Sequence, residues 1–212
     1  MASIQRSSMK DQVYELIKGR IYSQYYKSGE EIKILTLSKE LGVSNTPIRE
    51  ALTMLVAEGL LTTSLNNKFR VIELNEEEMG EFNEMIRILL VGGYREAHRD
   101  GRDRGLGEML RDAYEKQVQV LEAGDEQAYI EKAIAFDGCF VQVTGNERLI
   151  SIYENASYLF YLFVRHTYWK ELDNREKKLA EHRALIDAVE KGDGPLVERL
   201  LEEHYDEHYN MM

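Results

Sequence analysis

Residues 36–64 read TLSKELGVSNTPIREALTMLVAEGLLTTS, and this stretch decides the fold of the first part of the chain. Thr36 can cap a short helix, and Gly42 can supply the left-handed turn that ends it. Ser44 can then cap a second helix, which tolerates Pro47 in its first turn because the earliest backbone donors have no intrahelical partners. The sequence therefore predicts two helices joined by a tight turn.

The second helix, expected to run to about Gly59, has one apolar and one polar side. Its apolar residues recur with helical spacing and should face the core: Ile48, Leu52, Leu55 and Val56. Its polar residues should face outward: Asn45, Thr46, Arg49 and Thr53. This is the layout of a helix-turn-helix, in which the second helix enters the DNA major groove. The same spacing also describes ordinary helical hairpins, so the pattern alone leaves both readings open.

The flanking residues extend this motif. A first helix with apolar positions at Val13, Leu16, Ile17 and Ile21 should stop near Gln24. Two short strands, Leu60–Ser64 and Phe69–Leu74, should enclose a turn that contains Asn66 and Asn67. The sequence therefore predicts a winged helix-turn-helix. Lys68 and Arg70 at the wing could neutralise phosphates, and the amino end of the Ser44 helix offers backbone donors to a phosphate.

Composition and charge indicate two modules in the 212 residues. The chain is 43% hydrophobic and has a net charge of −11, which by itself argues against a nucleic-acid partner. Residues 1–75, however, hold 10 basic and 8 acidic side chains, whereas residues 76–212 hold 17 basic and 30 acidic ones. We therefore expect a DNA-binding domain over residues 1–75 and a second domain over 76–212.

Cysteine content and the chain start bear on location. The single cysteine, Cys139, cannot close an intramolecular disulfide, and the residues that follow Met1 lack the layout of a signal peptide. The longest apolar run, Tyr158–Val164, is far shorter than the ~20 residues that cross a bilayer. We expect a cytoplasmic protein with no membrane partner.

The second module reads as about six helices that form an antiparallel bundle. It contains no glycine-rich phosphate loop, no Cys-x-x-Cys pair and no nucleophile elbow, and Cys139 is expected to be inert. Asp137, His182 and His204 lie on three different predicted helices, each roughly in mid-helix with apolar neighbours. They could face one cavity, or they could be satisfied core histidines and a surface aspartate.

Two resemblances extend this reading. Residues 37–52, LSKELGVSNTPIREAL, followed by Glu58-Gly59-Leu60-Leu61, closely resemble the DNA-binding domain of GntR-family transcription regulators. The resemblance implies DNA contacts at the start of the short helix, at the start of the recognition helix and at the wing; with the Ser44 cap and Arg70, the expected set is Leu35, Thr36, Ser44, Asn45, Thr46, Arg49, Lys68 and Arg70. The family commonly has arginine where this chain has Leu35 and Asn45, and glycine where it has Lys68, so its operator sequence does not carry over.

The second resemblance concerns the helical module. Phe136-Asp137-Gly138-Cys139-Phe140, Glu181-His182-Arg183-Ala184 and the segment from Gly192 to His204 look like the FCD effector domain. Many members hold a divalent metal, and the resemblance assigns three ligands to Asp137, His182 and His204. The fourth ligand position of the family is Val141, which cannot bind a metal. The resemblance therefore leaves two possibilities. One is a three-ligand zinc, nickel or manganese centre completed by water or by an effector, and the other is a metal-free pocket. Arg87 would clamp an effector carboxylate or phosphate, or form an ordinary helix salt bridge.

Together these features predict a mostly helical, ligand-responsive transcription regulator that is not an enzyme. We expect it to bind double-stranded operator DNA as a homodimer, most simply as a repressor, and to sense a small organic acid through Arg87, Asp137, His182 and His204. One alternative is a regulator for which the metal ion itself is the signal. A metal-dependent hydrolase is a remote alternative, because no carboxylate is placed convincingly as its base.

Overall fold

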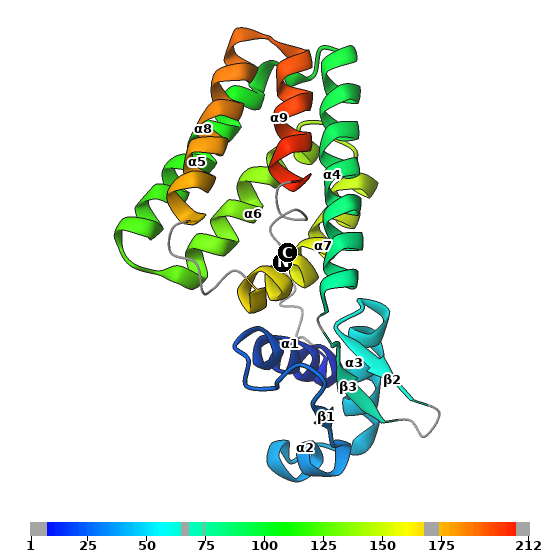
Figure 1. The fold of residues 1–212 in the computed structure, drawn as a ribbon. Helices are drawn as coiled ribbons and strands as arrows, with labels where there is room; N and C mark the ends of the chain where they lie inside the picture. Colours follow the sequence, from blue (N-terminus) through cyan, green and yellow to red (C-terminus); the bar gives the residue numbers. More distant parts are fainter. Residues whose placement is uncertain (1–7, 65–67, 74, 168–173, 207–212) are drawn as a thin grey trace, which may run out of the picture. The chain divides into compact units, whose positions relative to one another are not determined.

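A computed structural model describes residues 8–64, 68–73, 75–167 and 174–206. The chain divides into two compact units, Met1–Leu74 and Asn75–Met212 (Figure 1). The first contains a helix-turn-helix and a small sheet, and the second consists of helices. This confirms the predicted fold class. No helix in these described stretches is both long enough and apolar enough to cross a membrane.

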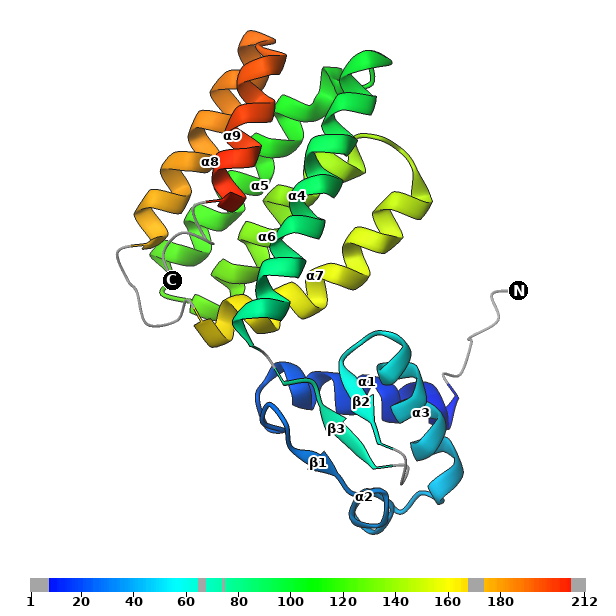
Figure 2. The same cartoon turned by 45° about the vertical axis from the view of Figure 1, so that its right-hand side comes forward.

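The amino-terminal unit combines helices with a three-stranded antiparallel sheet of order β1-β3-β2. Its elements are α1 (Met9–Tyr22), β1 (Glu31–Ile32), α2 (Ile34–Leu41), α3 (Asn45–Ala57), β2 (Leu61–Thr63) and β3 (Phe69–Val71). Arg70 of β3 lies between Glu31 of β1 and Thr62 of β2 in the strand register. The hairpin of β2 and β3 is therefore a wing beside the helix-turn-helix (Figure 2).

Apolar spacing explains how this unit packs. α3 packs against α1 and α2, and its Ile48, Leu52 and Leu55 have no exposed surface. Ile17 and Ile21 of α1 are also buried, as the helical spacing predicts. Leu16 is 38% exposed, so the packed stripe of α1 is narrower than the sequence suggests.

Two local features of this unit differ from the expectation. α2 begins earlier than expected: Lys33, not Thr36, is the residue before its first turn, and the Thr36 amide bonds to the Lys33 carbonyl. Glu31–Ile32 forms a strand that the sequence did not predict, because two residues are too few for an alternating pattern. The predicted turn residues at 65–67 and Leu74 lie outside the described residues.

The carboxy-terminal unit is a bundle of six α-helices within the described residues, as predicted. These are α4 (Glu76–Arg99), α5 (Leu106–Glu122), α6 (Glu126–Gln142), α7 (Glu147–Thr167), α8 (Asn174–Lys191) and α9 (Gly194–Asp206), with a 3-10 turn η1 (Asp103–Gly105) before α5. α6 packs against α4, α5 and α7, while α9 packs against α4 and α8 (Figure 2). Residues 136–141 of α6 are all buried, so this helix forms the centre of the core.

A glycine allows α4 to approach α6 closely. A β-carbon on Gly93 would lie 2.7 Å from the carbonyl oxygen of Phe140, closer than such contacts occur. Tyr94, the next residue, is buried and packs edge to face against the Phe140 ring. The close contact therefore fixes α4 against the helix that carries Asp137.

Candidate DNA-binding face and metal centre

α3 presents a polar outer face because its buried residues recur every three or four positions. Asn45, Thr46, Arg49 and Thr53 are all exposed, as the sequence predicts. Together with Lys10 of α1, Glu50 and Met54 they line an open hollow on the surface of this unit. The sequence did not single out Lys10, because it precedes the apolar stripe of α1 and belongs to no motif. Lys10 nevertheless lines the same hollow as the outer face of α3.

The turn that leads into α3 has the expected backbone. Gly42 adopts φ 65°, the left-handed conformation that glycine adopts without a steric penalty, and ends α2. Ser44 occupies the N-cap position of α3, but its side chain makes no capping hydrogen bond. Leu35 and Thr36 are both exposed on α2, and Leu35 retains 68% of its accessible surface. The first turn of α2 and the start of α3 are thus open to a partner.

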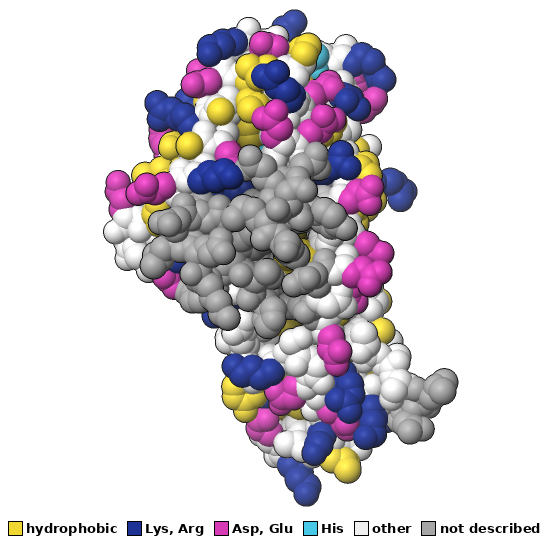
Figure 3. Space-filling model, viewed as in Figure 1, with side chains coloured by type: hydrophobic (Ala, Val, Ile, Leu, Met, Phe, Trp, Pro, Cys, Tyr) yellow, Lys and Arg dark blue, Asp and Glu magenta, His cyan; other side chains and the backbone are white. Residues whose placement is uncertain are grey.

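The two cations of the wing, Lys68 and Arg70, share one carboxylate partner. Lys68 Nζ lies 3.2 Å and Arg70 Nη2 lies 3.3 Å from Oε2 of Glu31. On the face that Figure 3 shows, basic and acidic side chains are intermixed over the amino-terminal unit. Glu31 was missed in the sequence because β1 was not predicted.

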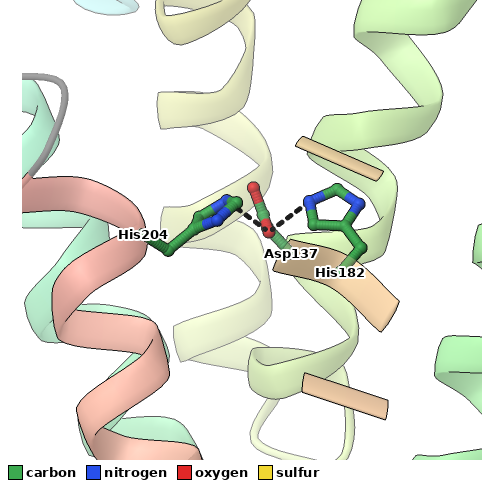
Figure 4. A group of neighbouring side chains, drawn as sticks. All are labelled: Asp137, His182 and His204. Atoms are coloured by element: carbon green, nitrogen blue, oxygen red, sulfur yellow. Dashed lines mark ion pairs between the residues drawn. The ribbon is translucent and has the colours of Figure 1, made fainter. Parts of the chain in front are cut away.

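In the helical unit, Asp137, His182 and His204 converge from α6, α8 and α9 (Figure 4). Each is at most 4% exposed, and one potential ligand atom from each lies within 4.8 Å of the other two. Asp137 Oδ1 lies 3.7 Å from His182 Nε2 and 3.6 Å from His204 Nε2. His204 is near the end of α9 rather than in mid-helix, but this does not separate it from the other two.

Contacts on the outer side of each residue orient its inner atom. Gln117 Oε1 lies 2.7 Å from His182 Nδ1, and Glu181 Oε2 lies 2.7 Å from His204 Nδ1. The Gln117 oxygen is an acceptor, so His182 Nδ1 carries the proton and His182 Nε2 keeps its lone pair. The Tyr205 hydroxyl donates to Asp137 Oδ2 over 2.7 Å. One potential ligand atom of each of the three residues consequently lies near those of the other two.

The electrostatics of this cluster follow from burial. Burial raises the pKa of Asp137 to about 7 and lowers the pKa of His182 well below its usual value. Lys178 Nζ lies 2.9 Å from Glu181 Oε2 and 3.3 Å from both ring nitrogens of His204, and burial lowers its pKa as well. A buried cluster with lone pairs facing inward favours a cation at its centre.

These residues fit a divalent metal ion. Asp137 Oδ1 and His182 Nε2 are buried and make no hydrogen bond, although an orphaned buried acceptor is costly. Two imidazole nitrogens and one carboxylate oxygen suit zinc, nickel or manganese, and the outer contacts are of the kind that accompany metal ligands. Val141 is buried one helical turn after Asp137 and offers no ligand atom. The sequence had not pointed to Gln117, Glu181 or Tyr205, because they belong to no motif.

The remaining predicted groups have different surroundings. Arg87 is half-buried on α4, which packs against α6 and α9. Cys139 is buried, and burial raises the pKa of its thiol to about 12. Its thiolate is therefore scarce at neutral pH, which agrees with the expected inert role.

Comparison with known proteins identifies both units. Residues 9–71 match the family described as "Bacterial regulatory proteins, gntR family", and residues 82–207 match the FCD domain. The chain is 29% identical over 181 residues to the "Uncharacterized HTH-type transcriptional regulator YdhC" of Bacillus subtilis (strain 168), covering 85% of this chain and 80% of that protein. It is 27% identical over 201 residues to the "Probable D-xylose utilization operon transcriptional repressor" of Paenarthrobacter nicotinovorans, covering 94% and 86%.

Solved structures share the fold. E. coli McbR/YncC matches with a TM-score of 0.72 at 20% identity over 97% of each chain. A transcriptional regulator GntR from Rhodococcus sp. RHA1 matches with a TM-score of 0.75 at 16% identity, again over 97% of each chain. The two domain matches and the sequence relatives confirm the expectation of a regulator rather than an enzyme. The chain belongs to the GntR family of bacterial regulatory proteins and is a DNA-binding transcription regulator with an FCD effector domain.

Proposed function

We propose that this regulator binds a palindromic operator as a homodimer, represses transcription there, and changes its operator affinity when a small organic acid binds in the helical unit. A homodimer supports a palindrome because its two-fold axis repeats the same contacts on two half-sites. The relative from Paenarthrobacter nicotinovorans, named as a repressor, supports repression.

The outer face of α3 supports the DNA-binding part of this proposal. Asn45, Thr46 and Arg49 would meet base edges and phosphates, with Leu35, Thr36, Ser44 and the wing beside them. Among the described residues Arg49 has no carboxylate partner, so its guanidinium group is available to a guanine or a phosphate.

Arg49→Ala tests this face. We expect operator binding to be lost, as measured by fluorescence anisotropy with a duplex obtained by binding-site selection. Lys116→Ala, which removes one positive charge from the helical unit, is the matched control and should bind like the wild type. Retained operator affinity in Arg49→Ala would contradict the assignment.

The convergence of Asp137 Oδ1, His182 Nε2 and His204 Nε2 carries the effector part of the proposal. These three atoms would hold the divalent ion, and when bound it supplies a positive charge that attracts an effector carboxylate. Because Val141 contributes no ligand, one side of the centre is left to water or to the effector. Arg87 on the adjacent α4 would hold a second anionic group of the same molecule.

Regulation then requires a difference in affinity. An effector can shift DNA binding only if it binds the DNA-competent and the DNA-incompetent arrangements with different affinities. A coupling of about 1 to 3 kcal/mol, or roughly 5- to 150-fold in affinity, is typical of allosteric proteins. The same factor must appear when effector affinity is measured with and without operator DNA.

The first experiment is the metal content of protein purified without a histidine tag. We expect one ion per chain in the wild type and none in a His182→Ala, His204→Ala double variant. His98→Ala, which removes an exposed histidine of α4, is the matched control and should keep the ion. If the wild type takes up no zinc, nickel or manganese even in excess, the histidines line a metal-free pocket.

A second candidate function follows from the same cluster. Three buried ligand atoms within 4.8 Å of one another also suit a regulator for which the ion itself is the signal. Operator affinity measured with chelator, with zinc alone, and with zinc plus a panel of small carboxylates separates the two. A change caused by zinc alone favours the metal sensor, whereas a change that needs a carboxylate favours the organic-acid sensor.

A further inference from the structure

One carboxylate holds both cations of the wing. Glu31 of β1 lies opposite Arg70 of β3 in the register, and Lys68 immediately precedes β3. Both cations reach the same oxygen, Glu31 Oε2, at 3.2 and 3.3 Å. Arg70 Nη1 also donates to the Gly29 carbonyl over 3.1 Å.

The group remains accessible to solvent. The side chains of Lys68 and Arg70 keep 50% and 47% of their accessible surface, and that of Glu31 keeps 24%. A phosphate can therefore approach both cations, but it would meet the Glu31 carboxylate at the same place. Two further acidic residues, Glu30 and Glu73, are exposed nearby, and a β-carbon on Gly29 would lie 3.0 Å from the Glu73 carboxylate.

We propose that Glu31 competes with DNA phosphates for Lys68 and Arg70, and so limits the DNA affinity of the wing and the salt dependence of binding. This inference rests on the proposed contact between the wing and DNA. The recognition helix differs from the wing, because no described carboxylate pairs with Arg49. Glu31 thus weakens the contacts of the wing with DNA phosphates and leaves the contacts of α3 with DNA bases unchanged.

The physical consequence is specific. Protein cations that neutralise phosphates release counterions, and each such contact adds about 0.9 to the slope of log affinity against log salt. While Glu31 shares these cations, each phosphate contact of the wing contributes less to the binding free energy. Since phosphate contacts carry no sequence information, Glu31 should weaken binding to operator and to unrelated DNA by a similar factor.

Glu31→Gln tests the proposal, because glutamine keeps the size of the side chain and removes its charge. By fluorescence anisotropy at low salt, we expect it to bind both a selected operator duplex and a scrambled duplex about 3- to 10-fold more tightly than the wild type. The salt slope should steepen by about 1. Glu15→Gln, the same charge change at an exposed position of α1, is the matched control and should shift affinity by less than about 2-fold.

The partner residues supply the second measurement. In a Lys68→Gln, Arg70→Gln background, Glu31→Gln should produce no gain beyond that of the Glu15→Gln control. A gain that persists there, or unchanged affinity of Glu31→Gln in the wild-type background, overturns the proposal. If Lys68→Gln, Arg70→Gln alone leaves DNA binding unchanged, the wing does not touch DNA, and the proposed wing contact fails together with this inference. If that variant binds weakly while Glu31→Gln does nothing, only the inference about Glu31 fails.

Discussion

The Oε1 atom of Gln117 lies 2.7 Å from Nδ1 of His182, and this contact between α5 and α8 turns the other ring nitrogen toward Asp137. Both residues are completely buried, and the Phe136 ring stacks on the imidazole at 3.9 Å between centroids. Stacking fixes the plane of the ring, and the amide fixes its tautomer. The lone pair that could bind a metal is therefore oriented before any ion arrives.

Gln117 should matter for metal binding although it would not touch the ion. Gln117→Leu removes the acceptor for Nδ1 and should lower zinc affinity by about 10- to 100-fold, as measured by competition with a chromophoric chelator. Gln117→Glu keeps an acceptor at this place and should recover most of the affinity. Gln119→Leu, an exposed position of the same helix, is the control. Wild-type zinc affinity in Gln117→Leu would show that the contact has no orienting role.

Asp137 should make the stability of the metal-free protein depend on pH. Burial raises its pKa from 3.8 to about 7, so between these values the native state holds a proton that the unfolded chain has lost. The free energy of unfolding must therefore fall as pH rises through this window. Asp137→Asn cannot ionise and lacks this contribution.

The measurement is urea denaturation of both proteins with a chelator across about pH 4 to 8. The stability of Asp137→Asn relative to the wild type should increase with pH by a few kcal/mol, since one pKa unit is worth about 1.4 kcal/mol, and should level off above about pH 7. A difference that stays constant with pH would mean that Asp137 keeps its ordinary pKa in the fold.

Two neighbouring glycines of α4 should respond in opposite ways to alanine. A β-carbon at Gly93 would lie 2.7 Å from the Phe140 carbonyl oxygen, so Gly93→Ala must push α4 away from α6 and should cost about 1 to 3 kcal/mol. At Gly92 a β-carbon would meet nothing within 4 Å, so Gly92→Ala should stabilise the helix by about 0.5 to 1 kcal/mol. Thermal or urea denaturation of the two variants is sufficient, and equal effects would refute the close approach of the helices.

Asn45 should set part of the operator preference. An asparagine at the exposed start of α3 can pair with adenine through two hydrogen bonds, whereas arginine prefers guanine. Asn45→Arg should therefore change the sequence recovered by binding-site selection without loss of binding. Ser23→Arg adds the same charge at an exposed position after α1 and should recover the wild-type site. An unchanged site from Asn45→Arg would exclude a base contact there.

Local signals were sufficient for the helices of both units. The apolar spacing of Ile48, Leu52 and Leu55 predicted which side of α3 is buried, because a helix repeats every 3.6 residues whatever it packs against. Gly42 predicted the turn for the same kind of reason, since few other residues adopt its backbone angles without strain. Thr36 misled the prediction of the start of α2, because a capping side chain is only one way to begin a helix.

The sequence, through its helical spacing and its resemblance to two known families, predicted the winged helix-turn-helix, the helical bundle and the three residues of the candidate metal centre. Only the tertiary structure decided which residues support them. Gln117 contacts His182, and Glu181 contacts His204. Glu31 contacts Lys68 and Arg70 through a pairing of strands that the sequence pattern did not predict. Periodicity reports how a segment divides between core and solvent, whereas contacts between distant segments depend on how those segments pack. The orientation of the histidines and the charge balance of the wing are properties of such contacts.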